Sequence, residues 1–512
     1  MNTKAQKLQR ICVCTALGLA LCLLAVLIIG GMFVTAHLGR QSWSHEAIVF
    51  TRDGLLANAL LTAATLGAVA LMNRLLSRFA MVKLSAAMLA AWCVGALVLV
   101  VGAEVKQMYD FAYVLEGAEL FARGNYKPLE IDYFHIYSYQ LGICLPMEVV
   151  KRLLPGLNLS MFMQVLNVFL SAGTAGAMAA LAQVLFSGRE AKAAVLLHVL
   201  FLPLALQCIY VYGTLPMLMM TACAALSLAL CMKRRKARFG LAYALCIAAA
   251  YMLKPNAAVP LIAMTIAALM DALVSRDWKL LIWAALGALL SVGLLKLVIW
   301  QYELRAGVQL TGNLSALARL VMGLQEGGAE AGWFNHYTEQ FFPFEVTQQQ
   351  EKEIAAADLA ARLAQMKADP LMTLAFFRDK LLSQFLEPSY CAMWYGDLCA
   401  HEGALAQGTK ALFADGGAIR AALERYMGLY QKMIHILCAA GIAGMLKRKD
   451  LSMAAVALPV CLLGGTLYHM IFEAKAQYMY MYIVLMMPVA AHGLCMISDW
   501  AFGLIDRRRR AR

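Results

Sequence analysis

The sequence predicts an all-α, polytopic membrane protein with about 12 transmembrane helices and two helical segments on its outer face. Hydrophobic residues make up 62% of the 512 residues and charged residues 15%, whereas a soluble globular chain is about half apolar and about a quarter charged. The mean hydropathy is +0.68. The apolar residues form runs of about 18 to 25 residues, the length that crosses roughly 30 Å of hydrocarbon. This composition excludes a nucleic-acid-binding protein, a secreted protein and a cytosolic enzyme as the main function.

The apolar runs assign the spans along the chain. The seventh and eighth predicted spans flank a break at Lys254-Pro255-Asn256, and the break leaves their exact boundaries open. The first run is too long for a cleaved signal peptide, so we expect it to stay in the membrane. The predicted spans are 11–36, 55–72, 84–102, 161–186, 193–210, 215–232, 239–253, 257–274, 280–300, 427–446, 451–470 and 478–498.

The distribution of positive charge predicts the orientation. The chain has a formal net charge of +13. With the N-terminus inside, most basic residues outside the spans fall in inner loops, and the short outer loops hold only Arg40, Arg52, Lys254 and Lys475. This is the positive-inside bias. It predicts a multi-pass protein of the cell membrane with both termini cytoplasmic, and most of the +13 reflects this topology.

The same orientation predicts the domain organisation. Residues 1–300 form an N-terminal transmembrane module with an outer loop at 103–160, residues 301–426 a large outer-face segment, and residues 427–512 the last transmembrane helices and a basic cytoplasmic tail. The inner loops are too short for a nucleotide-binding fold, and no Walker or GxGxxG motif is present. Any chemistry therefore lies on the outer face, and an activated donor has to arrive in the lipid.

The cysteines bear on cofactors, and one basic helical stretch bears on lipid contact. The 14 cysteines show no CxxC or metal-ligand spacing, and Cys391 and Cys399 are close enough in sequence to pair. No cofactor is predicted; a divalent metal is possible but not indicated. Arg378 and Lys380, on an apolar helical stretch, fit a helix that lies in the interface beside anionic head groups.

The first outer segment holds the strongest candidate for a functional group. Asp110 comes just past the outer end of a span, where an ionisable side chain is costly unless it is paired or hydrated. An amphipathic helix to Phe121 is predicted after it. An aromatic stretch, 133–142, then includes His135, Tyr137 and Gln140.

These residues resemble the first outer loop of GT-C glycosyltransferases, of the protein O-mannosyltransferase and aminoarabinose-transferase type. Three later stretches are similar to motifs of the same family, in part of its Gram-positive members. Two positions depart from the family pattern, because Ser138 stands where a proline is usual and Gln477 where an arginine is usual. The stretches that carry the resemblance are Asp110, Ala118, Gly124, Tyr126 and Gln140-Leu141-Gly142; Tyr212-Gly213-Thr214; Gly332–Tyr337 with Phe385–Tyr390; and Phe472–Tyr478.

The resemblance implies an inverting transfer of a sugar from a polyprenyl-phosphate donor to a cell-envelope polymer or protein. The implied partners are that donor, that acceptor and the lipid bilayer, without nucleic acid. Asp110 is then the general base. The residues expected to bind substrate are Lys254, Glu473, Lys475, Gln477, His135, Tyr137, Gln140, Trp333 and His336.

Each assignment has a structural alternative. Asp110 is alternatively a cap of the loop helix, and Lys254 a lysine that snorkels at a span end. Glu473 and Lys475 alternatively bridge each other. His135 and Tyr137 are alternatively belt anchors, and the cluster 333–337 a buried loop anchor. Two other functions remain open: a transporter or flippase of lipid-linked saccharides, and a non-catalytic envelope scaffold. The long outer segment and the missing internal repeat disfavour a transporter.

Overall fold

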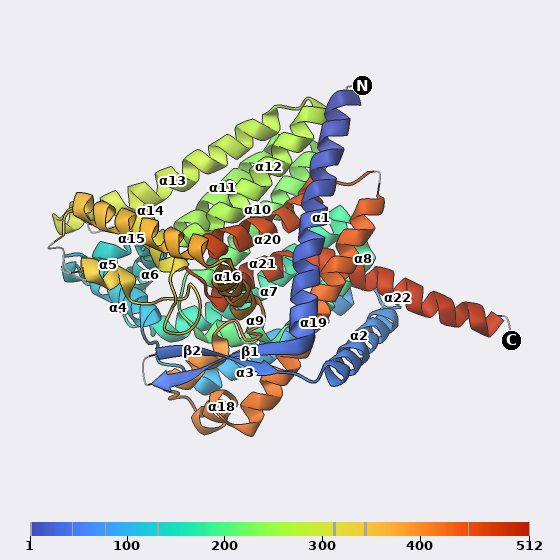
Figure 1. The fold of residues 1–512 in the computed structure, drawn as a ribbon, viewed down its shortest axis with the longest axis horizontal. Helices are drawn as coiled ribbons and strands as arrows, with labels where there is room; N and C mark the ends of the chain where they lie inside the picture. Colours follow the sequence, from blue (N-terminus) through green and yellow to red (C-terminus); the bar gives the residue numbers. More distant parts are fainter. Residues whose placement is uncertain are drawn as a thin grey trace.

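The computed structural model describes residues 3–510 apart from 43–44, 77, 131–132, 311–313, 343–345 and 449 (Figure 1). The side chains of residues 504–510, which include the basic tail at Arg507–Arg510, lie outside the described part, as does Arg512. The fold is nearly all-α. The candidate membrane-spanning helices and the shorter helices that accompany them are α1 (Thr3–Phe33), α2 (Leu55–Leu76), α3 (Met81–Ala103), α7 (Leu159–Leu185), α8 (Gly188–Leu200), α9 (Leu202–Leu206), α10 (Thr214–Arg234), α11 (Ala237–Leu253), α12 (Ala258–Ser275), α13 (Lys279–Ala306), α19 (Ala418–Lys447), α20 (Met453–Ile471), α21 (Ala476–Leu485) and α22 (Met487–Arg510).

The remaining helices belong to the two long connecting segments or to short turns between spans. The segment 103–160 holds α4 (Asp110–Ala122), η1 (Lys127–Leu129), α5 (Tyr133–Ile136), η2 (Ser138–Gln140) and α6 (Leu141–Leu153). The segment 301–426 holds α14 (Ala316–Leu324), η5 (Tyr337–Phe341), α15 (Gln348–Ala368), α16 (Pro370–Phe385), α17 (Ala392–Leu398) and α18 (Ala406–Phe413). The short helices η3 (Gln207–Ile209) and η4 (Pro255–Ala257) lie next to α9 and α12.

The structure confirms a multi-pass helical membrane protein but not the count of 12 spans. Nine of the described helices are long and apolar enough to cross a membrane, and up to 11 spans result if each bent pair is one span. The bent pairs are α8 with α9 and η3, at 62°, and α21 with α22, at 58°. The predicted seventh span corresponds to α11, a shorter apolar helix of 17 residues.

Prolines mark the breaks in the bundle. Lys254 has an extended backbone (φ −161°, ψ 117°), because Pro255 disfavours helical geometry in the residue before it. Pro203 lies in the first turn of α9 and Pro488 in the first turn of α22, directly after the two bends. A proline fits the first turn of a helix because its missing N–H has no partner there. The sequence thus sets where each helix stops and restarts.

A β-hairpin corrects the all-α prediction. The strands β1 (Val34–Ser42) and β2 (His45–Arg52) pair antiparallel, with Leu38 opposite Ile48. β-Branched residues stand at the start of β1 (Val34 and Thr35) and within β2 (Ile48, Val49 and Thr51), and such residues favour extended backbone. The hairpin packs on the second long segment, because Ala36 donates to the Leu386 carbonyl (3.1 Å) and Ile48 to that of Ala329 (3.2 Å).

Helices of the two long segments gather at one end of the molecule. Figure 1 shows α4, α5, α6, α14 and α15 together, at the end opposite the two chain termini. The α15 helix is rich in Ala, Gln, Glu and Lys, all of which favour helix. It begins with a capping box, in which Thr347 and Gln350 bind each other's backbone N–H groups. These five helices therefore lie away from both chain termini, whereas α16 lies nearer the centre of the view.

The bundle is held together in places by direct backbone contact. A Cβ atom added at Gly493 of α22 would lie 1.9 Å from the Leu437 carbonyl oxygen of α19, and one at Gly441 would lie 2.1 Å from the Val489 oxygen. Small residues allow this approach, and helices in membranes associate through such packing. The α19–α22 contact thus depends on two glycines.

Replacing Gly493 with alanine is expected to destabilise the protein by about 1–3 kcal/mol, because the added methyl group forces α19 and α22 apart. The measurement is the melting temperature of purified protein in detergent. Gly176→Ala in α7 is the matched control, since nothing lies within 4 Å of its added Cβ. Equal melting temperatures for the two variants would show that the α19–α22 contact does not limit stability.

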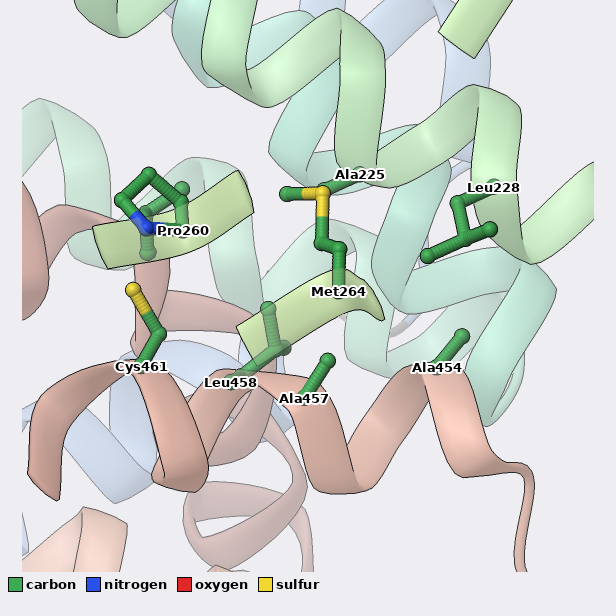
Figure 2. Close-up of a pocket in the computed structure, with 9 residues that line it drawn as sticks. Ala225, Leu228, Pro260, Met264, Ala454, Ala457, Leu458 and Cys461 are labelled. Atoms are coloured by element: carbon green, nitrogen blue, oxygen red, sulfur yellow. The ribbon is translucent and has the colours of Figure 1, made fainter. Parts of the chain in front are cut away.

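A small gap in the apolar core is not a binding site. It lies between α10, α12 and α20 and is lined by Met264, Leu228, Leu458 and other apolar side chains (Figure 2). Its volume is about 10 Å³, which is the room of about one water molecule. The chemistry of the protein has to be sought elsewhere.

Candidate functional site

Asp110 is the first residue of α4 and is held there by the neighbouring chain. The buried Gln107 side chain accepts from the Val211 N–H (2.8 Å) and donates to the Ile209 carbonyl (3.0 Å). Tyr109, just before Asp110, has a positive φ of 52°. A non-glycine residue in this region costs about 1–3 kcal/mol and is most often found at functional sites. The backbone at Asp110 is thus fixed in a strained position.

A hydrogen-bonded chain of polar side chains reaches Asp110. The Tyr133 hydroxyl donates to the Asp110 carboxylate and accepts from the Gln140 amide (3.1 Å). The same amide contacts the Tyr212 hydroxyl. Asp110 is solvent-accessible, although protein surrounds its carboxylate on most sides. This chain of contacts orients the carboxylate.

Charges around Asp110 set its protonation. Burial raises the pKa of Asp110, and Lys475, Lys254 and the Tyr133 hydrogen bond oppose that rise. A carboxylate whose pKa is raised accepts a proton more readily, which suits a general base. Asp110 is not the cap of α4, because the N-cap is Tyr109 and Asp110 is the first residue inside the helix, where its negative charge is favourable.

Lys254 lies in the break between α11 and η4 and turns into the protein. Its Nζ donates to Thr214 Oγ1 (2.8 Å) and lies 4.5 Å from the centroid of the Tyr212 ring. The side chain is buried, unlike that of a lysine that snorkels towards water. Burial lowers the pKa of Lys254 to about 7, although Asp110 and Glu473 oppose this.

Two glycines from the sequence motifs bring their loops against this break. A Cβ added at Gly142 would lie 1.8 Å from the Met252 carbonyl oxygen, and one at Gly213 would lie 2.3 Å from the Leu253 oxygen. No other residue fits such close backbone approach. The start of α6 and the turn before α10 are thereby held beside Lys254.

Lys475 and Glu473 do not bridge each other, so that alternative from the sequence is wrong. Lys475 Nζ pairs instead with Glu46 of β2 (2.6 Å). Burial favours the neutral amine, but Glu46 and Tyr395 hold the pKa of Lys475 above its ordinary value. Glu473 accepts from the Tyr478 hydroxyl (3.2 Å), and burial raises its pKa against the effect of Lys475.

A buried lysine clamps the second long segment to the chain around Glu473. The Lys380 side chain is 0% exposed, so the prediction that it faces lipid head groups is wrong. Its Nζ donates to the carbonyls of Gly323 and Phe472, the latter at 2.7 Å. The Ala474 N–H also donates to the Gly332 carbonyl (2.8 Å). These bonds fix α14 and α16 beside Glu473.

An amphipathic cavity of about 300 Å³ lies where these elements meet. Its wall combines tyrosines, one carboxylate and one guanidinium with apolar side chains of α12 and α20. Ile262 is 59% exposed and Tyr468 45%, so the cavity opens at the apolar surface of these two helices. It is lined by Tyr137, Tyr139, Pro255, Asn256, Ala258, Val259, Ile262, Leu314, Arg319, Met322, Phe334, Thr338, Tyr468, His469, Phe472, Glu473, Tyr478 and Tyr482.

The structure brings together six of the ten residues singled out in the sequence. Tyr137 and Glu473 line the cavity. Asp110, Lys254 and Lys475 act on one another electrostatically and on Glu473. Gln140 joins them through Tyr133, as described above. Asp110 does not line the cavity. Its negative charge nevertheless raises the pKa of Tyr137 and of Glu473, which do line it.

The other four residues are turned to structural contacts. Trp333 is fully buried, and its indole N–H donates to Ser383 (2.9 Å). His336 is exposed and pairs with Glu339 (2.9 Å). The Nδ1 atom of His135 contacts the Leu129 carbonyl (3.2 Å). The buried Gln477 lies beside Cys391, towards which its backbone N–H is directed. Trp333 therefore has the geometry of a loop anchor.

Two functional candidates were missed in the sequence. Glu46 reaches Lys475 only through the unpredicted hairpin, which the β-branched residues of 34–52 signal. Arg319 lines the cavity as the single charged residue of α14, ALARLVMGL. A lone cation in an apolar helix was the signal for it.

In the described part of the chain, the cysteines are not paired and the possible metal ligands are not clustered. Cys391 and Cys399 are both free and buried, so the possible disulfide is wrong. Within the described part of the chain, no group of three or more His, Cys, Asp or Glu side chains is arranged to hold a metal ion. The site therefore consists of carboxylates, cations and tyrosines.

The fold and the site together define a multi-pass helical membrane protein with a recessed, charged cavity that opens at its apolar surface. The chain matches no protein-family model, and no curated protein shows significant similarity to it. Its function is therefore argued from the geometry of the site.

Proposed function

We propose that the protein is a membrane glycosyltransferase of the cell membrane. It moves a sugar from a polyprenyl-phosphate donor to a cell-envelope acceptor on the outer face, and both termini are cytoplasmic. The observation that carries the proposal is the amphipathic cavity, which joins a polar, charged interior to the apolar surface of α12 and α20. A ligand with a polar head and a long hydrocarbon chain fits such a site.

Asp110 is the general base in this proposal. The acceptor hydroxyl or amine attacks the anomeric carbon of the sugar, and Asp110 takes the proton that this group loses. The bond from the anomeric carbon to the phosphate oxygen breaks, and its electron pair leaves with the polyprenyl phosphate. A single displacement of this kind inverts the anomeric centre. The Tyr133 hydrogen bond holds the carboxylate in position.

Lys254 is the cation that stabilises the leaving phosphate. It is buried and donates to a hydroxyl group, and among the described residues no carboxylate lies within ion-pair distance of it. A buried cation without an ion partner is unfavourable, and titratable groups in such surroundings are candidates for function. In a site shielded from water, a fixed cation stabilises developing negative charge strongly.

The test is a transfer assay with purified protein in liposomes. A radiolabelled polyprenyl-phosphate sugar and crude envelope acceptor are added, and label is expected to appear in the acceptor fraction. Protein-free liposomes are the control. Movement of the donor across the bilayer without transfer would indicate a flippase instead. No turnover with any lipid-linked donor would reject the proposal.

A further inference from the structure

Resting on the proposed function, we propose that Arg319 of α14 binds the phosphate group of the lipid-linked donor. Gln477, one of the residues expected from the sequence to bind substrate, carries no charge. Gln477 is buried outside the cavity wall. Arg319 stands on that wall and comes from a different part of the chain.

The position of Arg319 is fixed by the contact between α14 and the end of α20. A Cβ added at Gly323 would lie 2.4 Å from the Phe472 carbonyl carbon and 2.6 Å from the Ile471 oxygen. Lys380 then binds the carbonyls of both Gly323 and Phe472. Since Arg319 lies one turn before Gly323 on the same helix, this contact places Arg319 on the wall of the cavity that Glu473 also lines.

Within the described part of the chain, the guanidinium of Arg319 has no anionic partner. Among the described residues no carboxylate lies within ion-pair distance of it, and its contact is the Tyr139 ring, 5.8 Å from the centroid. The residue is half-buried. Arginines elsewhere are paired with carboxylates, for instance Arg305 with Glu148, Arg362 with Glu326, Arg378 with Asp379 and Arg420 with Glu424. An unpaired guanidinium in a cavity is suited to a phosphate, which it can bind through two parallel hydrogen bonds.

Two further cavity residues have polar atoms that lack a partner. His469 Nδ1 donates to the Glu473 carbonyl (2.9 Å), which leaves Nε2 as an acceptor. Among the described residues, neither His469 Nε2 nor the Tyr482 hydroxyl has a hydrogen-bond partner, although these residues are only 2% and 1% exposed. Buried polar atoms are nearly always hydrogen-bonded. These atoms therefore indicate a polar ligand in the cavity.

The size and the opening of the cavity identify the ligand as a phosphate joined to a long apolar chain. About 300 Å³ accommodates a sugar phosphate but not a polyprenyl chain as well. The chain has to leave through the opening at Ile262 and Tyr468, along the apolar surface of α12 and α20. Inorganic phosphate shares the head-group chemistry but lacks this second contact.

Binding of polyprenyl phosphate to the protein in nanodiscs of neutral lipid tests the inference. Arg319→Ala is expected to weaken this binding by about 10- to 100-fold, the effect of losing a hydrogen bond to a charged group. Arg319→Lys should recover part of the loss, because it restores the charge but not the paired geometry. Arg378→Ala is the matched control, since Arg378 is an exposed arginine of α16 that pairs with its neighbour Asp379. Polyprenol and inorganic phosphate are the two comparison ligands.

The outcomes separate this inference from the proposed function. The inference is supported when Arg319→Ala binds polyprenol as tightly as the wild type does but binds polyprenyl phosphate more weakly. Equal affinity of wild-type protein and Arg319→Ala for polyprenyl phosphate overturns it and leaves the proposed function standing. The inference is also overturned when Arg319→Ala loses as much affinity for polyprenol as for polyprenyl phosphate, because the cavity has then collapsed. Tight binding of inorganic phosphate overturns the claim that the bound phosphate belongs to a lipid. If the wild-type protein does not bind polyprenyl phosphate, both proposals are overturned.

Discussion

Replacing Asp110 with asparagine is expected to lower the rate of sugar transfer by about 10²- to 10⁴-fold, the contribution of a positioned general base. Asparagine has the same shape and still accepts a hydrogen bond from Tyr133, but it cannot take a proton. The measurement is the single-turnover rate in the liposome assay. Because the acceptor loses its proton only as the new bond forms, we expect the rate to fall while donor binding stays within a few-fold of wild type.

A carboxylate on the same helix provides the control for this prediction. Glu116 is exposed on α4 and lies outside the cavity wall, so Glu116→Gln should transfer sugar at the wild-type rate. The melting temperatures of both variants should stay close to that of the wild type. An Asp110→Asn protein that is folded and fully active would remove Asp110 from the mechanism and leave it as an acidic residue in the first turn of α4.

Lys254→Met is expected to lower transfer by about 10²- to 10³-fold, as when one stabilising group at a developing charge is removed. The pH dependence of the wild type gives an independent measurement. Because burial lowers the pKa of Lys254 to about 7, the amine is protonated below this pH and neutral above it. Activity is thus expected to fall as the pH rises through about 7. On the acid side it falls when Asp110, whose pKa is raised by burial, takes up a proton.

Lys254→Arg provides the control, since a guanidinium stays charged across this range. Its alkaline fall should move to higher pH, even if geometry lowers its maximal rate. The melting temperature of Lys254→Met should not drop, because a buried cation without an ion partner is replaced by an apolar chain of similar length. A wild-type profile that stays flat above pH 7, or an unchanged profile in Lys254→Arg, would contradict the role of Lys254.

The membrane fold was largely readable from the sequence because each span is a local property. A run of about 20 apolar residues is long enough to cross the bilayer whatever it packs against. Prolines such as Pro255 likewise end helices through local sterics. The hairpin β1–β2 was missed because residues 34–52 follow an apolar run directly and show no clean alternation. The prediction extended the first span to residue 36, whereas α1 ends at Phe33.

The candidate site was only partly readable for the opposite reason. Asp110 and Lys254 stand out because a charge next to an apolar run is expensive. Trp333 and His336 drew attention as an aromatic cluster, but the first anchors the loop on Ser383 and the second faces solvent. An aromatic side chain has the same composition signal whether it packs in a core or lines a pocket.

The sequence alone determined a multi-pass helical membrane protein, the breaks in its helices and an ionisable residue beside a span end. Tertiary structure decided which charges meet. Lys475 and Glu46 pair across 429 positions of the chain, and Arg319 reaches the cavity only because Gly323 and Lys380 bind α14 to the end of α20. Burial of apolar runs depends on local composition, whereas an ion pair or a cavity wall depends on where separate helices pack. A membrane span can therefore be predicted from one segment, whereas an ion pair or a cavity wall can be predicted only from the packing of several segments.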